Sequence, residues 1–331
     1  MPQASYPYAI GRIRVLENKL LNNDKVERMI EADTPADVLK ILAESEYGTG
    51  QELASAHDYE KLLAAELRKV YDFIEEVTPD KELTDLFWLQ YDVHNLKVLL
   101  KARAIGGGDE PLMDTGSIVS DSLKAAVYKG DHSDVPPFVS EVLREIDEKY
   151  GERFDPHRIE VALDKAGYKH IFNVLRKKKN AFLQEFFQKR VDLINIKMLL
   201  RVKGLGEDAG FLSSMLIPGG TIADELLIKA LDEPVDKLVY ALRDSEYAQV
   251  VALGVRAFER DGSLTVYERL ADDFLLHFVK SRSFDPLGFE AIAGYIMAKE
   301  NEIKLVRLIM VGKINNISTD KIRERLRDVY V

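Results

Sequence analysis

An internal repeat is the feature of this chain that most narrows its fold. Residues 91–106 and 191–206 share the pattern Asp-x-x-Asn-[Leu/Ile]-Lys-x-Leu-Leu-[Lys/Arg], and the two copies lie one hundred residues apart. A third copy keeps the lysine, at Lys304, but has Lys299 and Glu302 where the others have the Asp and the Asn. Recurrence at a fixed period indicates one structural unit per repeat.

A second pair of segments recurs along the chain. Residues 33–39 resemble residues 232–238, and each is followed by the triplet Ser-Glu-Tyr, at 45–47 and at 245–247. A weaker middle copy lies at residues 134–138. One copy of each pattern per hundred residues predicts three similar units in one compact body. The expected units are residues 1–110, 111–212 and 213–331.

The local signals within each unit are helical. Thr34-Pro35 and Thr78-Pro79 each place a threonine N-cap before a proline, which suits the first turn of a helix. Gly106 and Gly204 follow basic residues, a pattern typical of helix C-terminal ends. No alternating, valine-rich run between hairpin turns stands out. We therefore expect an all-α fold.

One of the repeated helices shows how its polar residues are distributed. At about 100° per residue, the helix around residues 87–101 has one narrow polar wedge and is apolar over most of the rest. Asp92 and Asn95 fall inside the apolar region, where unsatisfied polar groups are costly. Because both recur, at Asp192 and Asn195, a structural polar network between helices is favoured over direct contact with a partner protein. The wedge consists of Gln90, His94, Lys97 and Lys101.

No catalytic constellation is recognisable. The chain lacks a phosphate-binding loop, an H-E-x-x-H zinc motif and a G-x-S-x-G nucleophile motif, and its six histidines are scattered without ligand spacing. It has no cysteine, and its net charge of −10 opposes binding to duplex DNA. No run approaches the roughly 18 apolar residues of a membrane helix, and no signal peptide is visible at the start. We expect no catalytic residue, no cofactor, no metal and no nucleic-acid partner.

Three segments together resemble the V/A-type ATPase C subunits, the family that includes the eukaryotic d subunit. They are the opening 8–17 with Leu20-Leu21, the repeated pattern at 92 and 192, and the closing 302–309 with Gly312-Lys313. The resemblance extends from roughly residue 6 to the end, and the order and spacing of the segments make it specific.

The resemblance implies a fold and a role. It implies a funnel of three helical repeats around a pseudo-threefold axis, whose wide end sits on the proteolipid ring and whose socket receives the shaft formed by the D and F subunits. The chain would be a non-catalytic central-stalk subunit, a monomer within a hetero-oligomer, peripheral on the cytoplasmic face of the membrane. It would link ATP synthesis or hydrolysis to translocation of H⁺ or Na⁺.

Repeated basic residues are the candidates for contact with such partners. Electrostatic complementarity sets register and encounter between subunits more than raw affinity. The run 176–179 reads most simply as a solvated helix face, or else as a dock for an acidic partner or an anionic lipid surface. The candidate partner-binding residues are Lys97, Lys101, Lys197, Arg201, Lys304, Arg307, Lys177 and Lys178.

Other functional classes are compatible with the same sequence. The main alternative is a helical-repeat scaffold that binds another protein, although units of about one hundred residues exceed the usual solenoid periods of roughly 34–47 residues. An all-α enzyme with a dispersed site would instead turn over a phosphorylated or isoprenoid substrate. A nucleic-acid binder comes last, because only the run 176–179 favours it.

Overall fold

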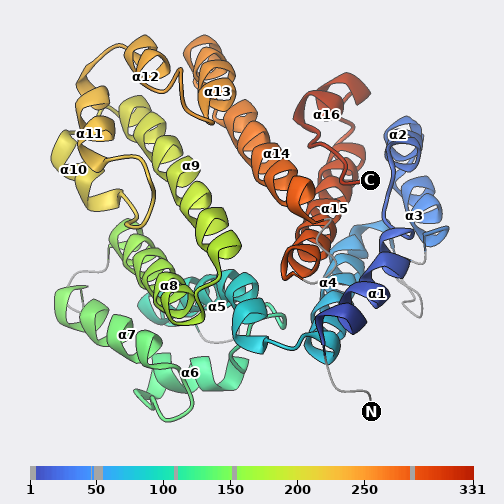
Figure 1. Ribbon diagram of the computed structural model, residues 1–331, viewed down its shortest axis with the longest axis horizontal. Coiled ribbons are helices and arrows are strands. Elements are labelled where there is room, and N and C mark those ends of the chain that lie inside the picture. Colours follow the sequence, from blue (N-terminus) through green and yellow to red (C-terminus); the bar gives the residue numbers. More distant parts are fainter. Residues whose placement is uncertain (1–4, 46, 48–54, 108–110, 151–154, 284–287) are drawn as a thin grey trace. The chain divides into compact units, whose positions relative to one another are not determined.

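The computed structural model describes residues 5–45, 47, 55–107, 111–150, 155–283 and 288–331 (Figure 1). Over these residues the chain forms sixteen α-helices and one 3-10 helix, and they contain no strand. The expected all-α fold class is thereby confirmed. None of the described helices combines the length and the apolar character that crossing a membrane requires.

The helices pack into two compact units. The first combines the two ends of the chain, up to Asp80 and from Ala241 on, and the second is the continuous stretch Lys81–Tyr240. The two units group helices that pack together, whereas each predicted repeat is a continuous stretch of about one hundred residues that resembles the others in sequence. The three-repeat division therefore stays a prediction.

The first unit is built around one long helix. Helix α15 packs against α1, α4 and α14, and it is buried on nearly all sides, as a helix without a polar face must be. Gly254 lets α13 approach α14, because a Cβ at that position would lie 2.6 Å from the Tyr267 ring. The helices of this unit are α1 (Tyr6–Glu17), α2 (Asn23–Glu31), α3 (Pro35–Ala43), η1 (Ala56–Asp58), α4 (Tyr59–Val77), α13 (Ala248–Asp261), α14 (Thr265–Arg282), α15 (Glu290–Ile314) and α16 (Thr319–Arg325).

The second unit contains the other two long helices, α5 and α9. Helix α8 packs against α5, α7 and α9, and the ring of Phe87 on α5 lies against those of Phe186 and Phe187 on α9, with centroids 5.7 and 5.8 Å apart. The helices of this unit are α5 (Lys81–Ile105), α6 (Ser120–Lys129), α7 (Pro137–Tyr150), α8 (Pro156–Lys178), α9 (Ala181–Leu205), α10 (Ala209–Met215), α11 (Asp224–Asp232) and α12 (Val235–Ala241).

Two of the four predicted helix-end signals are confirmed. Thr34 caps α3, since its hydroxyl accepts a hydrogen bond from the Asp37 N–H at 3.2 Å, and Pro35 begins the helix. Gly106 follows α5 with φ of 74°, in the left-handed region that glycine adopts readily.

The other two signals were assigned to the wrong position. Thr78 ends α4, and its hydroxyl accepts from the Asp80 N–H within the link, so α5 begins only at Lys81. Helix α9 continues through Gly204 because the left-handed cap is at Gly206, with φ of 71°. The glycine that terminates a helix is the one whose N–H can reach back to the last carbonyls.

The C-terminal segment, residues 326–331, is held against α14 and α15. The Asp328 N–H donates to the Asp273 carboxylate at 2.8 Å, and the Asn301 amide donates to the Asp328 carbonyl at 2.7 Å. Arg327 donates to Asp272 at 2.5 Å. Burial raises the pKa of Asp273 to about 6, although the hydrogen bond from Asp328 lowers it.

Asp273 should make stability depend on pH. A carboxyl whose pKa is higher folded than unfolded binds its proton more tightly when folded, so its contribution is present below about pH 4 and is lost as the pH rises through about 6. Relative to Asp273→Asn, the wild-type protein should gain about 1–2 kcal/mol of unfolding free energy on acidification from pH 7 to 5. Urea titrations of both proteins at each pH measure the difference, and parallel pH profiles would contradict the assignment.

Candidate functional site

The repeated Asp and Asn hold the segment that follows each helix. In α5, the fully buried Asp92 carboxylate accepts hydrogen bonds from the N–H and hydroxyl of Ser117, at 3.0 and 2.6 Å, and from the Ile118 N–H at 3.1 Å. One turn further along, the Asn95 side chain accepts from the Met113 N–H and donates to the Met113 carbonyl, both at 2.9 Å. Burial raises the pKa of Asp92 to about 6, although the hydrogen bonds to Ser117 and Ile118 lower it.

The second copy repeats this geometry. Asp192 of α9 accepts from the Thr221 N–H and hydroxyl at 2.8 and 2.6 Å, and from the Ile222 N–H at 2.9 Å. Asn195 exchanges two hydrogen bonds with the backbone of Ile217, at 2.8 and 2.9 Å. The predicted structural role of these residues is confirmed, but their partners lie in links between helices instead of on helices. Helical N–H groups are already bonded within their own helix, whereas those of an extended link are free to donate.

The links carry a matching pattern that sequence reasoning missed. Residues 116–118 read Gly-Ser-Ile and residues 220–222 read Gly-Thr-Ile, 24 and 28 residues after the respective aspartates. A Cβ at Gly116 or Gly220 would lie 2.1 or 2.2 Å from the aspartate oxygen, so only glycine permits this approach. Comparing the links as well as the helices would have revealed the pattern.

Three of the candidate partner-binding residues come together at one pocket of the second unit. Lys97, Lys197 and Arg201 line this pocket between α5, α8 and α9, which has a volume of about 380 Å³. Apolar side chains form part of the same lining, and Arg190 adds a further cation, donating to Gln90 at 2.9 Å. We call this site the α5–α9 basic pocket. It can bind carboxylates presented by an acidic partner, with apolar contact beneath them.

Carboxylates of α8 already pair with two lysines of α5. The Lys97 ammonium donates to both oxygens of Asp164 at 2.7 and 2.8 Å, and Lys101 forms an ion pair with Glu160. Burial raises the pKa of Asp164, while Lys97 opposes the shift. Burial also lowers the pKa of His94, beside both lysines. Sequence reasoning missed Glu160 and Asp164, although their four-residue spacing matches that of the lysines.

The other candidates lie apart from this pocket. In the first unit, Lys304 donates to Asp272 at 3.2 Å, and Arg307 makes two hydrogen bonds to Glu60 at 2.8 and 2.9 Å. In the second unit, Lys178 pairs with Glu82 at 3.0 Å. All of these pairs are partly exposed, so they contribute little to stability. The role of these residues in binding a partner stays a prediction.

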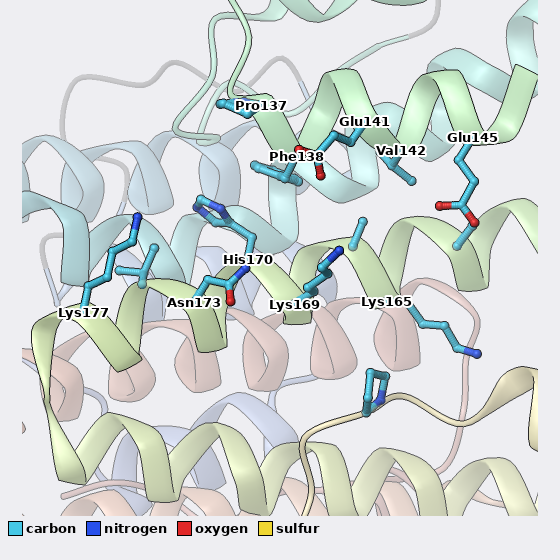
Figure 2. Close-up of a pocket in the computed structure, with 14 residues that line it drawn as sticks. Pro137, Phe138, Glu141, Val142, Glu145, Lys165, Lys169, His170, Asn173 and Lys177 are labelled. Atoms are coloured by element: carbon cyan, nitrogen blue, oxygen red, sulfur yellow. The ribbon is translucent and has the colours of Figure 1, made fainter.

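Lys177 lines a second pocket, between α7 and α8. This pocket has a volume of about 470 Å³, and the rings of Phe138 and His170 stack in it with centroids 4.4 Å apart (Figure 2). Glu141 and Glu145 of α7 and lysines of α8 line the pocket together, although the Lys165 ammonium points away from α7 and donates to the Ser214 carbonyl at 2.6 Å (Figure 2). Burial lowers the pKa of His170, and Lys177 adds to the effect.

The described residues contain no group of three or more histidine, aspartate or glutamate side chains arranged to hold a metal ion. The charged groups described above are instead lysines and arginines paired with carboxylates. Such groups suit recognition of another charged surface.

Known proteins are similar to this chain over nearly its full length. The family model of the ATP synthase (C/AC39) subunit matches residues 9–325. The C subunit of the A-type ATP synthase of Methanocaldococcus jannaschii is 28% identical over 98% of this chain and 86% of its own length. The C subunit of the V-type sodium ATPase of Enterococcus hirae is 26% identical, over 96% and 97% of the two chains. The C subunit of the A-type ATP synthase of Thermococcus kodakarensis is 25% identical, over 98% and 91%.

Proposed function

This chain belongs to the ATP synthase (C/AC39) subunit family, and from that membership we propose that it is a non-catalytic central-stalk subunit of a rotary V/A-type ATPase. The observation that carries the proposal is the family match over residues 9–325, together with the C subunits of A-type and V-type enzymes that align along nearly the full chain. In this role the protein joins the shaft made by the D and F subunits to the proteolipid ring, on the cytoplasmic face of the membrane. Rotation of the joined parts then links ATP synthesis or hydrolysis to translocation of H⁺ or Na⁺.

We further propose that the α5–α9 basic pocket faces the D–F shaft. Lys97, Lys197 and Arg201 line this one pocket, although they come from two helices one hundred residues apart in the sequence. An acidic segment of the shaft would take over Lys97, which Asp164 now occupies. The exchange leaves Asp164 without its lysine, but burial already raises the pKa of this carboxyl, so Asp164 can take up a proton while the complex gains the apolar contact.

Charge reversal at the pocket tests this proposal. The Lys97→Glu, Lys197→Glu double variant should bind the purified D–F pair about 10- to 100-fold more weakly, because two attractive contacts become repulsive. Affinity is measured with the tagged full-length protein at low and moderate salt, and wild-type binding should weaken as salt rises. Circular dichroism verifies that the variant is folded.

The matched control carries the same change in charge elsewhere. Lys40 and Lys229 are about three-quarters exposed, and they pair with the nearby carboxylates of Asp37 and Glu233. The Lys40→Glu, Lys229→Glu variant should bind the D–F pair as the wild type does. Equal weakening in both variants would mean that overall charge governs the binding, and it would refute the proposed contact between the pocket and the shaft. Failure of the wild type to bind either the D–F pair or the purified ring would leave the scaffold function instead.

A further inference from the structure

The third long helix holds the start of the chain in the way that the other two hold their links. The Leu21 N–H donates to the buried carboxylate of Glu302 on α15, at the position where Asn95 and Asn195 accept from Met113 and Ile217. Leu21 precedes α2, just as the other two residues precede α6 and α11. Within the first unit, this hydrogen bond therefore joins segments that lie 281 residues apart in sequence.

The link after Leu21 is shorter than the links after Met113 and Ile217. Helix α6 starts seven residues after Met113 and α11 starts seven residues after Ile217, but α2 starts only two residues after Leu21. The N-terminal link therefore has no Gly-[Ser/Thr]-Ile segment. An aspartate at position 299 would lack the donors that Asp92 and Asp192 receive, and a buried, unpaired carboxylate is strongly unfavourable.

A lysine at this position is satisfied by a different set of groups. The Lys299 ammonium lies 2.7 Å from Glu302 and 2.8 Å from Glu66, and 4.4 Å from the centroid of the Tyr47 ring. The Tyr47 hydroxyl donates to Glu302 at 3.0 Å. The side chains of Lys299 and Glu302 are only 6% and 3% exposed. Burial lowers the pKa of Lys299, but Glu302 and Glu66 raise it by more, so the lysine stays charged.

We propose that α5, α9 and α15 carry three related docking sites for the chain's own links, and that Lys299, Glu302 and Glu66 make the α15 site selective for the N-terminal segment, residues 6–45 with Tyr47. The selectivity works in both directions. The N-terminal segment on α5 or α9 would leave Asp92 or Asp192 without its hydroxyl and N–H donors. Either link on α15 would present donors to an ammonium group, which accepts none.

The charges in this network therefore have a role separate from stability. Replacing a buried ion-pair network with neutral groups of similar size is often close to neutral for stability. On the present proposal, it would remove the discrimination between the three docking sites of this chain. A polar group that specifies one pairing among similar ones is well attested in coiled coils. The proposal concerns folding of the chain alone, and it is independent of the proposed function.

The test is a neutral triple variant, Glu66→Gln, Lys299→Met, Glu302→Gln, of the full chain. The Glu302→Gln change retains one oxygen that accepts from the Leu21 N–H, and its amide NH2 can donate to the Tyr47 hydroxyl in place of the second oxygen. The thermal midpoint of the triple variant, measured without prior unfolding, should be close to that of the wild type. After refolding from denaturant, we expect the yield of native monomer to fall about threefold or more, with the Leu21 amide in the remaining species exchanging about tenfold faster.

Refolding yield and protection of the Leu21 amide are also measured for a control variant. The variant Glu185→Gln, Lys189→Met removes an ion pair with a buried lysine of α9, in the unit that does not contain Lys299, and should refold with the wild-type yield. A triple variant that refolds with wild-type yield and wild-type protection of Leu21 would overturn the proposal. If the triple variant does not accumulate as folded protein, Glu302→Gln alone is judged by the same criteria.

Discussion

Replacing Asp192 with alanine is expected to lower the free energy of unfolding by about 3–5 kcal/mol. The carboxylate is fully buried and accepts three hydrogen bonds, two from Thr221 and one from the Ile222 N–H. Alanine would leave these donors without an acceptor, and a buried, unsatisfied donor costs more than an average hydrogen bond contributes. Urea denaturation followed by circular dichroism measures the loss.

Asparagine at the same position is the matched control. Asp192→Asn keeps the shape of the side chain and one oxygen that can accept from the Thr221 and Ile222 N–H groups. Its loss of stability should be less than half of that caused by alanine. Equal losses would mean that the charge, and not the pattern of acceptors, holds the link. A loss below about 1 kcal/mol for alanine would show that the link is not anchored here.

Substitution of Gly220 by alanine should cost about 2–4 kcal/mol, because the new Cβ has no room. It would lie 2.2 Å from the Asp192 oxygen and 3.3 Å from a methyl group of Val191. The link can avoid the clash only by moving away, and it then loses the hydrogen bonds to Asp192. Thermal and urea unfolding of the variant measure this effect.

Two further variants separate the clash from the general effect of replacing a glycine. Gly11 lies within α1 with no heavy atom within 4 Å of its added Cβ, so Gly11→Ala should stabilise the protein by about 0.5–1 kcal/mol. In an Asp192→Ala background the obstructing oxygen is absent, and Gly220→Ala should then cost much less than in the wild type. Additive losses in the double variant would contradict the close contact.

Three residues of the α5–α9 basic pocket were selected from the sequence as candidate partner contacts, a role that stays a prediction. Lys97, Lys197 and Arg201 were selected because they recur on a polar wedge, and they do line one pocket. The resident carboxylates Glu160 and Asp164 were not selected, because nothing in α8 alone shows which helix it will pack against. Their pairing with basic residues of α5 exists only once α5 and α8 lie side by side.

The sequence by itself determined the helical fold class, the family and the structural role of the repeated Asp and Asn. The fold class follows from local helical signals, the family from the resemblance of three segments to known C subunits, and the structural role from the cost of burying a polar group wherever its helix packs. Only the tertiary structure decided what satisfies those groups. Asp92, Asp192 and Lys299 occupy the same repeat position, yet the first two are satisfied by main-chain and hydroxyl donors of a link and the third by Glu66 and Glu302. The reason is that these partners are set by link length and by contacts between distant segments, and neither can be read from the residues around the position itself.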